Sequence, residues 1–294
     1  MNLRTQLKGT GVAIVTPFKH NMLVDFDALG KLIDFIIANK VEYIVTLGTT
    51  GETPVLDTVE KFDIINYTVE KVNGKVPIVV GVGGNNTKEV MENLQSYPLE
   101  KVTAVLSASP YYNKPSQEGI FQHYKYLAEA SPKPLILYNV PGRTGSNITA
   151  DTTLRLAYEV ENIAGIKEAS GNMIQCMQIL KDRPENFLVV SGDDHLTLPL
   201  IACGMDGVIS VAANCFPANF SEMVRHCLND NFTAARPLHY KCLQGNNLLF
   251  AENNPAGVKA FLFELGLIEN VLRLPLVPLS NSIHQQVKTF LKEY

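Results

Sequence analysis

The sequence predicts an α/β protein in which eight parallel strands close into a (β/α)8 TIM barrel, followed by a C-terminal helical appendage. Eight short β-branched runs recur along the 294 residues, and segments with apolar residues at three- and four-residue spacing lie between them. The runs are almost continuously apolar, which is typical of parallel strands covered on both faces. An open doubly wound sheet with an extra domain is the alternative, but eight successive strand–helix units favour the closed barrel.

Each predicted strand is bounded by Gly, Pro or Ser residues, which end extended segments. In chain order the runs are GVAIVTP from Gly11, YIVTLG from Tyr43, PIVVGVG from Pro77, AVLSASP from Ala104, PLILYNVP from Pro134, IAGIKEAS from Ile163, FLVVSG from Phe187 and GVISVAA from Gly207. The eighth strand–helix unit ends near Leu228. We therefore expect a catalytic barrel over residues 1–228 and a helical region over residues 229–294, where Pro255, Pro275 and Pro278 interrupt the helical pattern.

Composition and charge exclude several classes of function. The chain has 25 Lys and Arg against 29 Asp and Glu, a net charge of −4, so neither nucleic acid nor an anionic membrane is an expected partner. No apolar run approaches the roughly 18 residues that span a bilayer. The first apolar run is too short for a secretory signal, and five cysteines without a C-x-x-C pair argue against disulfides and structural zinc. We expect a cytoplasmic globular protein.

In a barrel of this kind the chemistry lies at the carboxyl ends of the strands. The second strand is followed by the sequence GTTGE at residues 48–52, where the hydroxyls of Thr49 and Thr50 stand between glycines that let backbone N–H groups approach a ligand. Such a turn is a plausible cradle for a carboxylate. The alternative is a strand-to-helix turn in which a threonine caps the helix.

Tyrosine side chains occur at the ends of the fourth and fifth predicted strands. Tyr111 and Tyr112 come after the fourth strand, and Tyr138 ends the fifth, shortly before Arg143. A phenol passes protons when its pKa is lowered, and otherwise it fills the rim of the barrel. Each tyrosine alone is better interpreted as a residue that fills the rim of the barrel. Two tyrosines at strand ends strengthen the interpretation that they transfer protons.

The sixth strand places Lys167 inside an otherwise apolar run. Burial favours the neutral amine of a lysine, and a neutral amine is the nucleophile that attacks a carbonyl to form a Schiff base. If the side chain instead points out of the barrel, it forms an ordinary ion pair. Lys167 is the most informative residue of the sequence.

Motifs for common cofactors and metals are missing. The GVGGNN segment from Gly81 lacks the third glycine of a dinucleotide fingerprint, and no G-x-x-x-x-G-K occurs, so nicotinamide and ATP sites are unsupported. Asp193, Asp194 and His195 have no second ligand cluster to accompany them, and we interpret them as a helix N-terminus whose acids favour the dipole. We expect no cofactor and no metal.

Six motifs in order resemble those of the dihydrodipicolinate synthase family across nearly the whole chain. They are GTTGE at 48–52, PYYNKP at 110–115, YNVP at 138–141, RTG at 143–145, GIKEA at 165–169 and GVISV at 207–211. The resemblance implies a class I aldolase-like barrel, a homotetramer (a dimer of dimers) or a homodimer. It further implies condensation of pyruvate with L-aspartate 4-semialdehyde to 4-hydroxy-tetrahydrodipicolinate in lysine biosynthesis.

The resemblance also implies roles for individual residues. Lys167 would form the Schiff base, Thr50 would bind the pyruvate carboxylate, and Tyr138 would serve as acid and base. Thr49 and Tyr112 would complete a hydroxyl relay, with Tyr112 reaching into a neighbouring subunit. Arg143 would grip the carboxylate of the aldehyde substrate, and the backbone around Ile209 would face the same pocket.

The family resemblance leaves regulation and two other functions open. Asn85, Glu89 and Tyr111 match the family's positions for inhibitory L-lysine, whereas Pro54 and the cationic Lys61 depart from sensitive enzymes, so weak or absent inhibition is expected. A sister aldolase acting on a sugar acid is the alternative enzyme, and Arg143 argues against it. A non-catalytic pyruvate-binding barrel would be marked by loss of the lysine or the tyrosine, and both are present.

Overall fold

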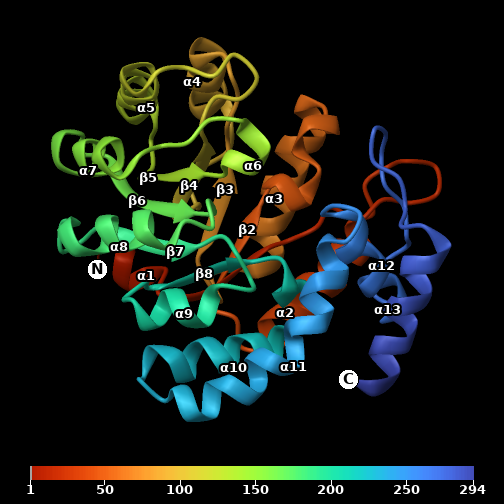
Figure 1. The fold of residues 1–294 in the computed structure, drawn as a ribbon. Helices are drawn as coiled ribbons and strands as arrows, with labels where there is room; N and C mark the ends of the chain where they lie inside the picture. Colours follow the sequence, from red (N-terminus) through yellow and green to blue (C-terminus); the bar gives the residue numbers. More distant parts are fainter. Residues whose placement is uncertain (1) are drawn as a thin grey trace.

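The computed structural model describes residues 2–294, and it contains the closed barrel that the sequence predicts (Figure 1). Eight parallel strands pair in the order β1-β2-β3-β4-β5-β6-β7-β8, and β8 pairs back with β1. The strands are β1 Gly9–Ala13, β2 Tyr43–Thr46, β3 Ile78–Gly81, β4 Ala104–Ala108, β5 Leu135–Asn139, β6 Ile163–Glu168, β7 Leu188–Ser191 and β8 Gly207–Ser210. Almost every strand residue is buried, as expected where helices cover one face and the barrel interior the other.

The seam between β1 and β8 explains the largest difference between a predicted and an observed strand start, since the others agree to within one residue. β1 begins at Gly9 rather than at the predicted Gly11, because Gly9 and Thr10 pair with Gly207 and Val208. A Cβ on Gly207 would lie 1.9 Å from the carbonyl oxygen of Gly9, and the φ of Gly207 is +149°. Only glycine fits this position, so closure of the barrel depends on it.

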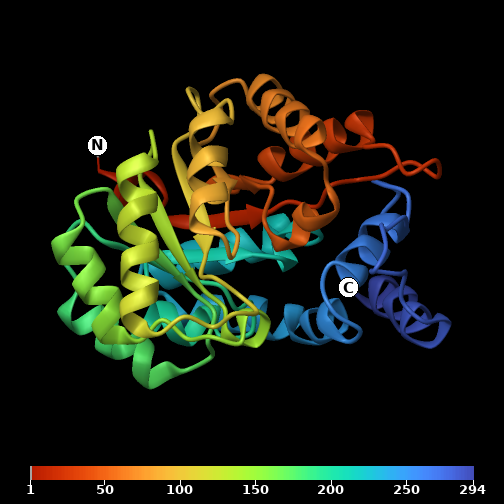
Figure 2. The ribbon, with the colours of Figure 1, turned by 90° about the horizontal axis from the view of Figure 1, so that it is seen from above.

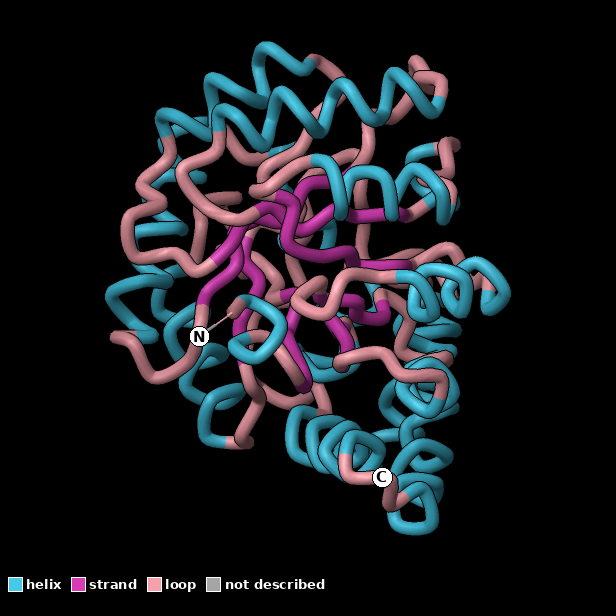
Figure 3. The backbone as a smooth tube through the Cα atoms, turned by 90° about the vertical axis from the view of Figure 1, so that its left-hand side faces the viewer, coloured by secondary structure: helices cyan, strands magenta, loops and turns pink. Residues whose placement is uncertain are grey.

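Helices surround the strands on all sides (Figure 3). Those up to the end of the eighth unit are α1 Leu3–Gln6, α2 Phe26–Ala38, α3 Thr58–Val72, α4 Thr87–Ser96, α5 Gln117–Ala130, α6 Pro141–Thr144, α7 Ala150–Glu159, α8 Met173–Asp182, α9 Thr197–Ala202 and α10 Pro217–Leu228. Short 3₁₀ turns are η1 Thr49–Gly51, η2 Thr53–Val55 and η3 Ala212–Asn214. Their starts follow the usual caps: Asp57 and Glu60 form a reciprocal capping box at α3, and Ser116 caps α5.

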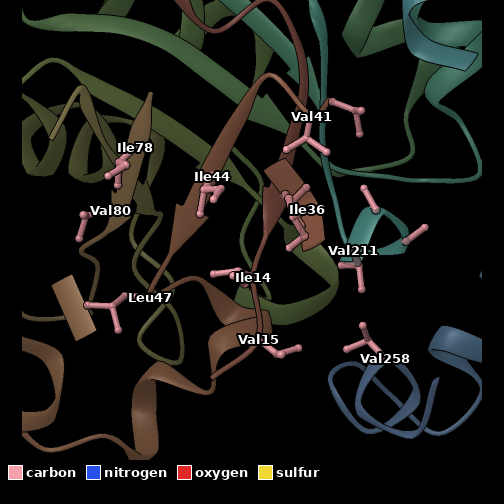
Figure 4. Close-up of a cluster of buried hydrophobic side chains, with 14 of the residues drawn as sticks. Ile14, Val15, Ile36, Val41, Ile44, Leu47, Ile78, Val80, Val211 and Val258 are labelled. Atoms are coloured by element: carbon pink, nitrogen blue, oxygen red, sulfur yellow. The ribbon is translucent and has the colours of Figure 1, made fainter. Parts of the chain in front are cut away.

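The predicted C-terminal helices are α11 Phe232–Phe250, α12 Ala256–Glu264 and α13 Asn281–Glu293. Figure 2 shows that the arrow of β1 points toward the side on which these helices lie, which is the carboxyl end of the barrel. Val258 of α12 belongs to the same apolar cluster as Val15 and Val211 of the barrel (Figure 4). The C-terminal region therefore covers the end at which a barrel carries its chemistry.

Within residues 2–294, no helix is both long enough and apolar enough to cross a membrane. In the same range, no three His, Cys, Asp or Glu side chains lie where they could together hold a metal ion.

Candidate active site

Lys167 lies inside the barrel. It stands opposite Tyr138 in the register of β5 and β6, and its side chain is 5% exposed. Its Nζ is 4.2 Å from the centroid of the Tyr138 ring. A Cβ on Gly192 would lie 2.9 Å from Cε of Lys167, so the glycine makes room for the lysine. The interpretation of Lys167 as an outward-pointing ion-pair partner is therefore wrong.

Tyr138 faces a cavity of 490 Å³ at the carboxyl end of the barrel. The ring is 8% exposed and packs in the interior cluster that also contains Val140 and Ile209, which is 1% exposed. Among residues 2–294, neither the Tyr138 hydroxyl nor the Lys167 amine has a hydrogen-bond partner. Both groups are thus available to a bound substrate.

The GTTGE turn forms η1, and left-handed residues flank it: Leu47 and Glu52 both have a φ of +54°. Thr50 is buried, and its Oγ1 accepts a hydrogen bond of 2.9 Å from the Nδ2 of Asn254. With one lone pair so engaged, the Thr50 hydroxyl keeps its hydrogen to donate to a ligand carboxylate. Thr49 lines the cavity. Since Asp57 caps α3, the helix-cap alternative for these threonines is wrong.

Arg143 lines the same cavity from α6. Its Nη2 donates a hydrogen bond of 3.2 Å to the backbone oxygen of Asn254. The rest of the guanidinium fork is available for a carboxylate, which it can hold by two parallel bonds.

Of the predicted catalytic residues, Thr49 and Tyr138 line the cavity and Lys167 lies behind Tyr138, whereas Tyr112 points into solvent. Its side chain is 88% exposed, and its φ of +71° is uncommon for a bulky residue. The neighbouring Tyr111 is 44% exposed and does line the cavity. The loop thus directs one tyrosine inward and the other outward.

The same cavity brings together the residues predicted for lysine binding. Asn85, Glu89 and Tyr111 line it, as do Pro54 and Lys61. The Asn85 amide donates a hydrogen bond of 3.4 Å to the Tyr111 backbone oxygen. Residues of both predicted sites therefore line one cavity.

Sequence reasoning missed two residues of the C-terminal region. Asn254 contacts both Thr50 and Arg143, and Lys259 forms a buried ion pair with Glu52. No local pattern marks Asn254. Lys259 stands inside the apolar segment AGVKAFLF, which is the same signal that singled out Lys167.

The interpretation of Asp193, Asp194 and His195 as a helix N-terminus is wrong. The helix begins at Thr197, and the Asp194 carboxylate instead accepts hydrogen bonds from the backbone N–H groups of Val211 and Ala212, at 3.1 and 2.9 Å. Burial raises the pKa of Asp194. This carboxylate thereby fixes the turn that follows β8.

Three comparisons place the chain among known proteins. The model of the dihydrodipicolinate synthetase family matches residues 6–294. The 4-hydroxy-tetrahydrodipicolinate synthase of Phocaeicola vulgatus is 52% identical over 291 residues, which cover 99% of this chain and 98% of that protein.

Solved structures agree. The pyruvate complex of the dihydrodipicolinate synthase from Acinetobacter baumannii has a TM-score of 0.95 and 40% identity, covering 98% of each chain. A monomeric dihydrodipicolinate synthase variant has a TM-score of 0.96 and 39% identity, covering 99% of this chain and 98% of that one. With its barrel, its interior lysine and these similarities together, the chain belongs to the dihydrodipicolinate synthetase family.

Proposed function

We propose that the chain is a 4-hydroxy-tetrahydrodipicolinate synthase, an enzyme that condenses pyruvate with L-aspartate 4-semialdehyde. The names of relatives about half identical over nearly the whole chain support this reaction. The observation that carries the proposal is the buried amine of Lys167, 4.2 Å from the ring of Tyr138 and without a carboxylate partner in residues 2–294.

In the first step the Lys167 amine attacks the ketone carbon of pyruvate, and water leaves as the protonated imine forms. Tyr138 lies close enough to pass protons to and from the oxygen that departs. The imine withdraws electrons, so a proton leaves the methyl carbon and an enamine results. Thr50 holds the pyruvate carboxylate through its free hydroxyl and the backbone of the GTTGE turn.

In the second step the enamine carbon attacks the aldehyde carbon of the semialdehyde, which Arg143 holds by its carboxylate. The amino group of the same substrate then attacks the imine carbon, closes the ring and releases Lys167. One water leaves for each pair of substrates joined. The backbone around Ile209 forms the pocket wall beneath the imine.

The exposed Tyr112 supports an assembly in which it completes a neighbour's site. We infer that the enzyme works as a homodimer or as a homotetramer built from two dimers, with Thr49, Tyr138 and the partner's phenol passing protons in sequence. The barrel of residues 1–228 carries the chemistry, residues 229–294 cover it, and the location is the cytoplasm.

Borohydride trapping tests the central step. Reduction in the presence of pyruvate is expected to add the pyruvate skeleton to Lys167 alone, as mapped by peptide mass. Lys167→Ala should abolish the label and lower kcat/KM by at least about 10³-fold. Lys181→Ala, which removes an exposed lysine from α8, is the matched control and should label like the unaltered protein. A label on another lysine, or none, would refute the mechanism.

A further inference from the structure

A second lysine, Lys259 of α12, is more deeply buried than Lys167. It is fully inaccessible, and its Nζ pairs with the carboxylate of Glu52, which is also buried. The same Nζ donates a hydrogen bond of 2.9 Å to the Val271 backbone oxygen and lies 4.2 Å from the centroid of the Phe18 ring. Burial lowers the pKa of Lys259, and the Glu52 carboxylate opposes this effect. Such a pair is costly to desolvate, so a purely structural purpose is better served by apolar side chains.

Glu52 is the last residue of the GTTGE turn. Its φ of +54° is a conformation that costs free energy for a residue other than glycine, so contacts elsewhere must hold it. Two come from beyond the barrel: the Lys259 ammonium, and the backbone N–H of Arg273, which donates a hydrogen bond of 3.1 Å to Oε2 of Glu52. Removing them releases one end of the turn.

The rest of the turn is held from other elements. The Thr16 hydroxyl donates a hydrogen bond of 2.8 Å to the Gly51 oxygen, and the Thr53 hydroxyl donates one of 2.9 Å to the Gly48 oxygen. The Glu52 N–H donates one of 3.1 Å to the Thr49 oxygen, so the strained residue connects directly to the 3₁₀ turn of Thr49 and Thr50. A change at Glu52 thus alters the orientation of the two hydroxyls and the N–H groups that face the cavity.

We propose that Glu52 and Lys259 are positioning residues whose buried ion pair orients the turn that binds the pyruvate carboxylate. This inference rests on the proposed function, because that function makes pyruvate the ligand of the turn. The inference adds that a helix outside the barrel controls the orientation of that turn. Neither side chain lines the cavity, so both act through Thr49 and Thr50.

The experiment measures pyruvate binding in three variants of the full-length protein: Lys259→Met, Glu52→Gln, and the two combined. Steady-state rates give kcat and the KM for pyruvate, borohydride trapping gives the pyruvate concentration that half-labels Lys167, and thermal unfolding gives Tm. Arg183→Met is the matched control, since it also removes the cation from a buried ion pair, the one with Asp206 at the amino end of the barrel.

Lys259→Met is expected to raise the KM for pyruvate and the half-labelling concentration by at least about tenfold, with kcat at saturating pyruvate within about threefold of the unaltered enzyme. Arg183→Met should lower Tm and leave the KM within about twofold. If Lys259→Met or Glu52→Gln fails to fold because it strands the other partner's buried charge, the combined variant, which carries neither charge, gives the same readout.

Folded variants with a lowered Tm and an unchanged KM would overturn the inference and reduce the pair to a structural role. In that case the unaltered enzyme still labels at Lys167, and the proposed function stands. Absence of label in the unaltered enzyme would overturn the proposed function, and the inference with it.

Discussion

The two ends of the barrel treat their buried polar groups in opposite ways. At the amino end, the Asp206 carboxylate accepts hydrogen bonds from Arg4 at 2.8 Å, from the Val189 N–H at 2.9 Å and from Arg183. At the carboxyl end, Lys167 and Tyr138 lie side by side without a hydrogen-bond partner among residues 2–294. The Asp206 carboxylate is thus satisfied by partners and contributes stability, whereas Lys167 and Tyr138 are left for a substrate.

Left-handed backbone occurs at both ends, since Lys40 and Asn73 adopt it shortly before β2 and β3. At the carboxyl end it is found at Leu47 and Glu52, on either side of the 3₁₀ turn of Thr49 and Thr50. Such residues persist only where the surroundings hold them, and they concentrate at binding sites. The difference between the ends teaches that this fold separates stability from chemistry along the barrel axis.

The largest effect in our remaining predictions comes from Arg143→Ala. Loss of a paired ionic hydrogen bond costs about 2 to 5 kcal/mol, so kcat/KM for aspartate semialdehyde should fall by roughly 30-fold to several thousand-fold. Because Arg143 is exposed, Tm should change little. Separate assays of imine formation with pyruvate and of the complete reaction check this. An equal loss of rate in imine formation and in the complete reaction, or a large fall in Tm, would contradict this role of Arg143. It would also remove the distinction between a stabilising amino end and a catalytic carboxyl end.

A second prediction sharpens the role of Tyr112. Tyr112→Phe and Lys167→Ala subunits, each inactive alone, are mixed under conditions that exchange subunits. In a random mixture half of the dimers are hybrids, and one of the two sites in each hybrid is intact if Tyr112 acts on its neighbour, so about a quarter of full activity should return.

Exchange itself is verified by mass spectrometry of intact dimers, with a mixture of Lys167→Ala and Lys167→Met subunits as the control that cannot recover. Verified exchange without recovery would place the phenol in its own subunit or outside the chemistry.

The smallest expected effect is inhibition by L-lysine bound in the cavity. Lys61 and Glu89 both line this cavity, and a cation there repels a cationic ligand by about 1 kcal/mol at a few ångströms in water. We expect weak or absent inhibition in initial-rate measurements, and stronger inhibition in Lys61→Ala. Half-inhibition at submillimolar lysine in the unaltered enzyme would show that the charge of Lys61 does not govern binding.

The strands could be predicted because burial on both faces leaves a local trace in the sequence. All eight runs become strands, whereas the interior position of Lys167 required the structure, because a strand buried on both faces does not show which face the lysine takes. The start of β1 could not be predicted, since it depends on pairing with Gly207 far along the chain.

The same limit applies to the site. Asn254 reaches Thr50 across 204 positions of sequence, and no local pattern encodes such a contact. Asp194 was misinterpreted because the N–H groups that donate to its carboxylate lie on another turn, after β8, rather than in the helix that follows it. Contacts between segments that are far apart in the sequence could be found only in the structure.

The position of Lys259 and Arg273 late in the chain has a consequence for synthesis on the ribosome. The barrel can close only after β8 has been synthesised, because β8 pairs with β1. Glu52 lacks its partners for longer, until both Lys259 and the backbone N–H of Arg273 have left the exit tunnel. A nascent chain with a finished barrel therefore lacks the two contacts that hold Glu52, and the GTTGE turn is then held only by Thr16 and Thr53. The turn acquires its full set of contacts only when the last part of the chain has been made and docks on the barrel.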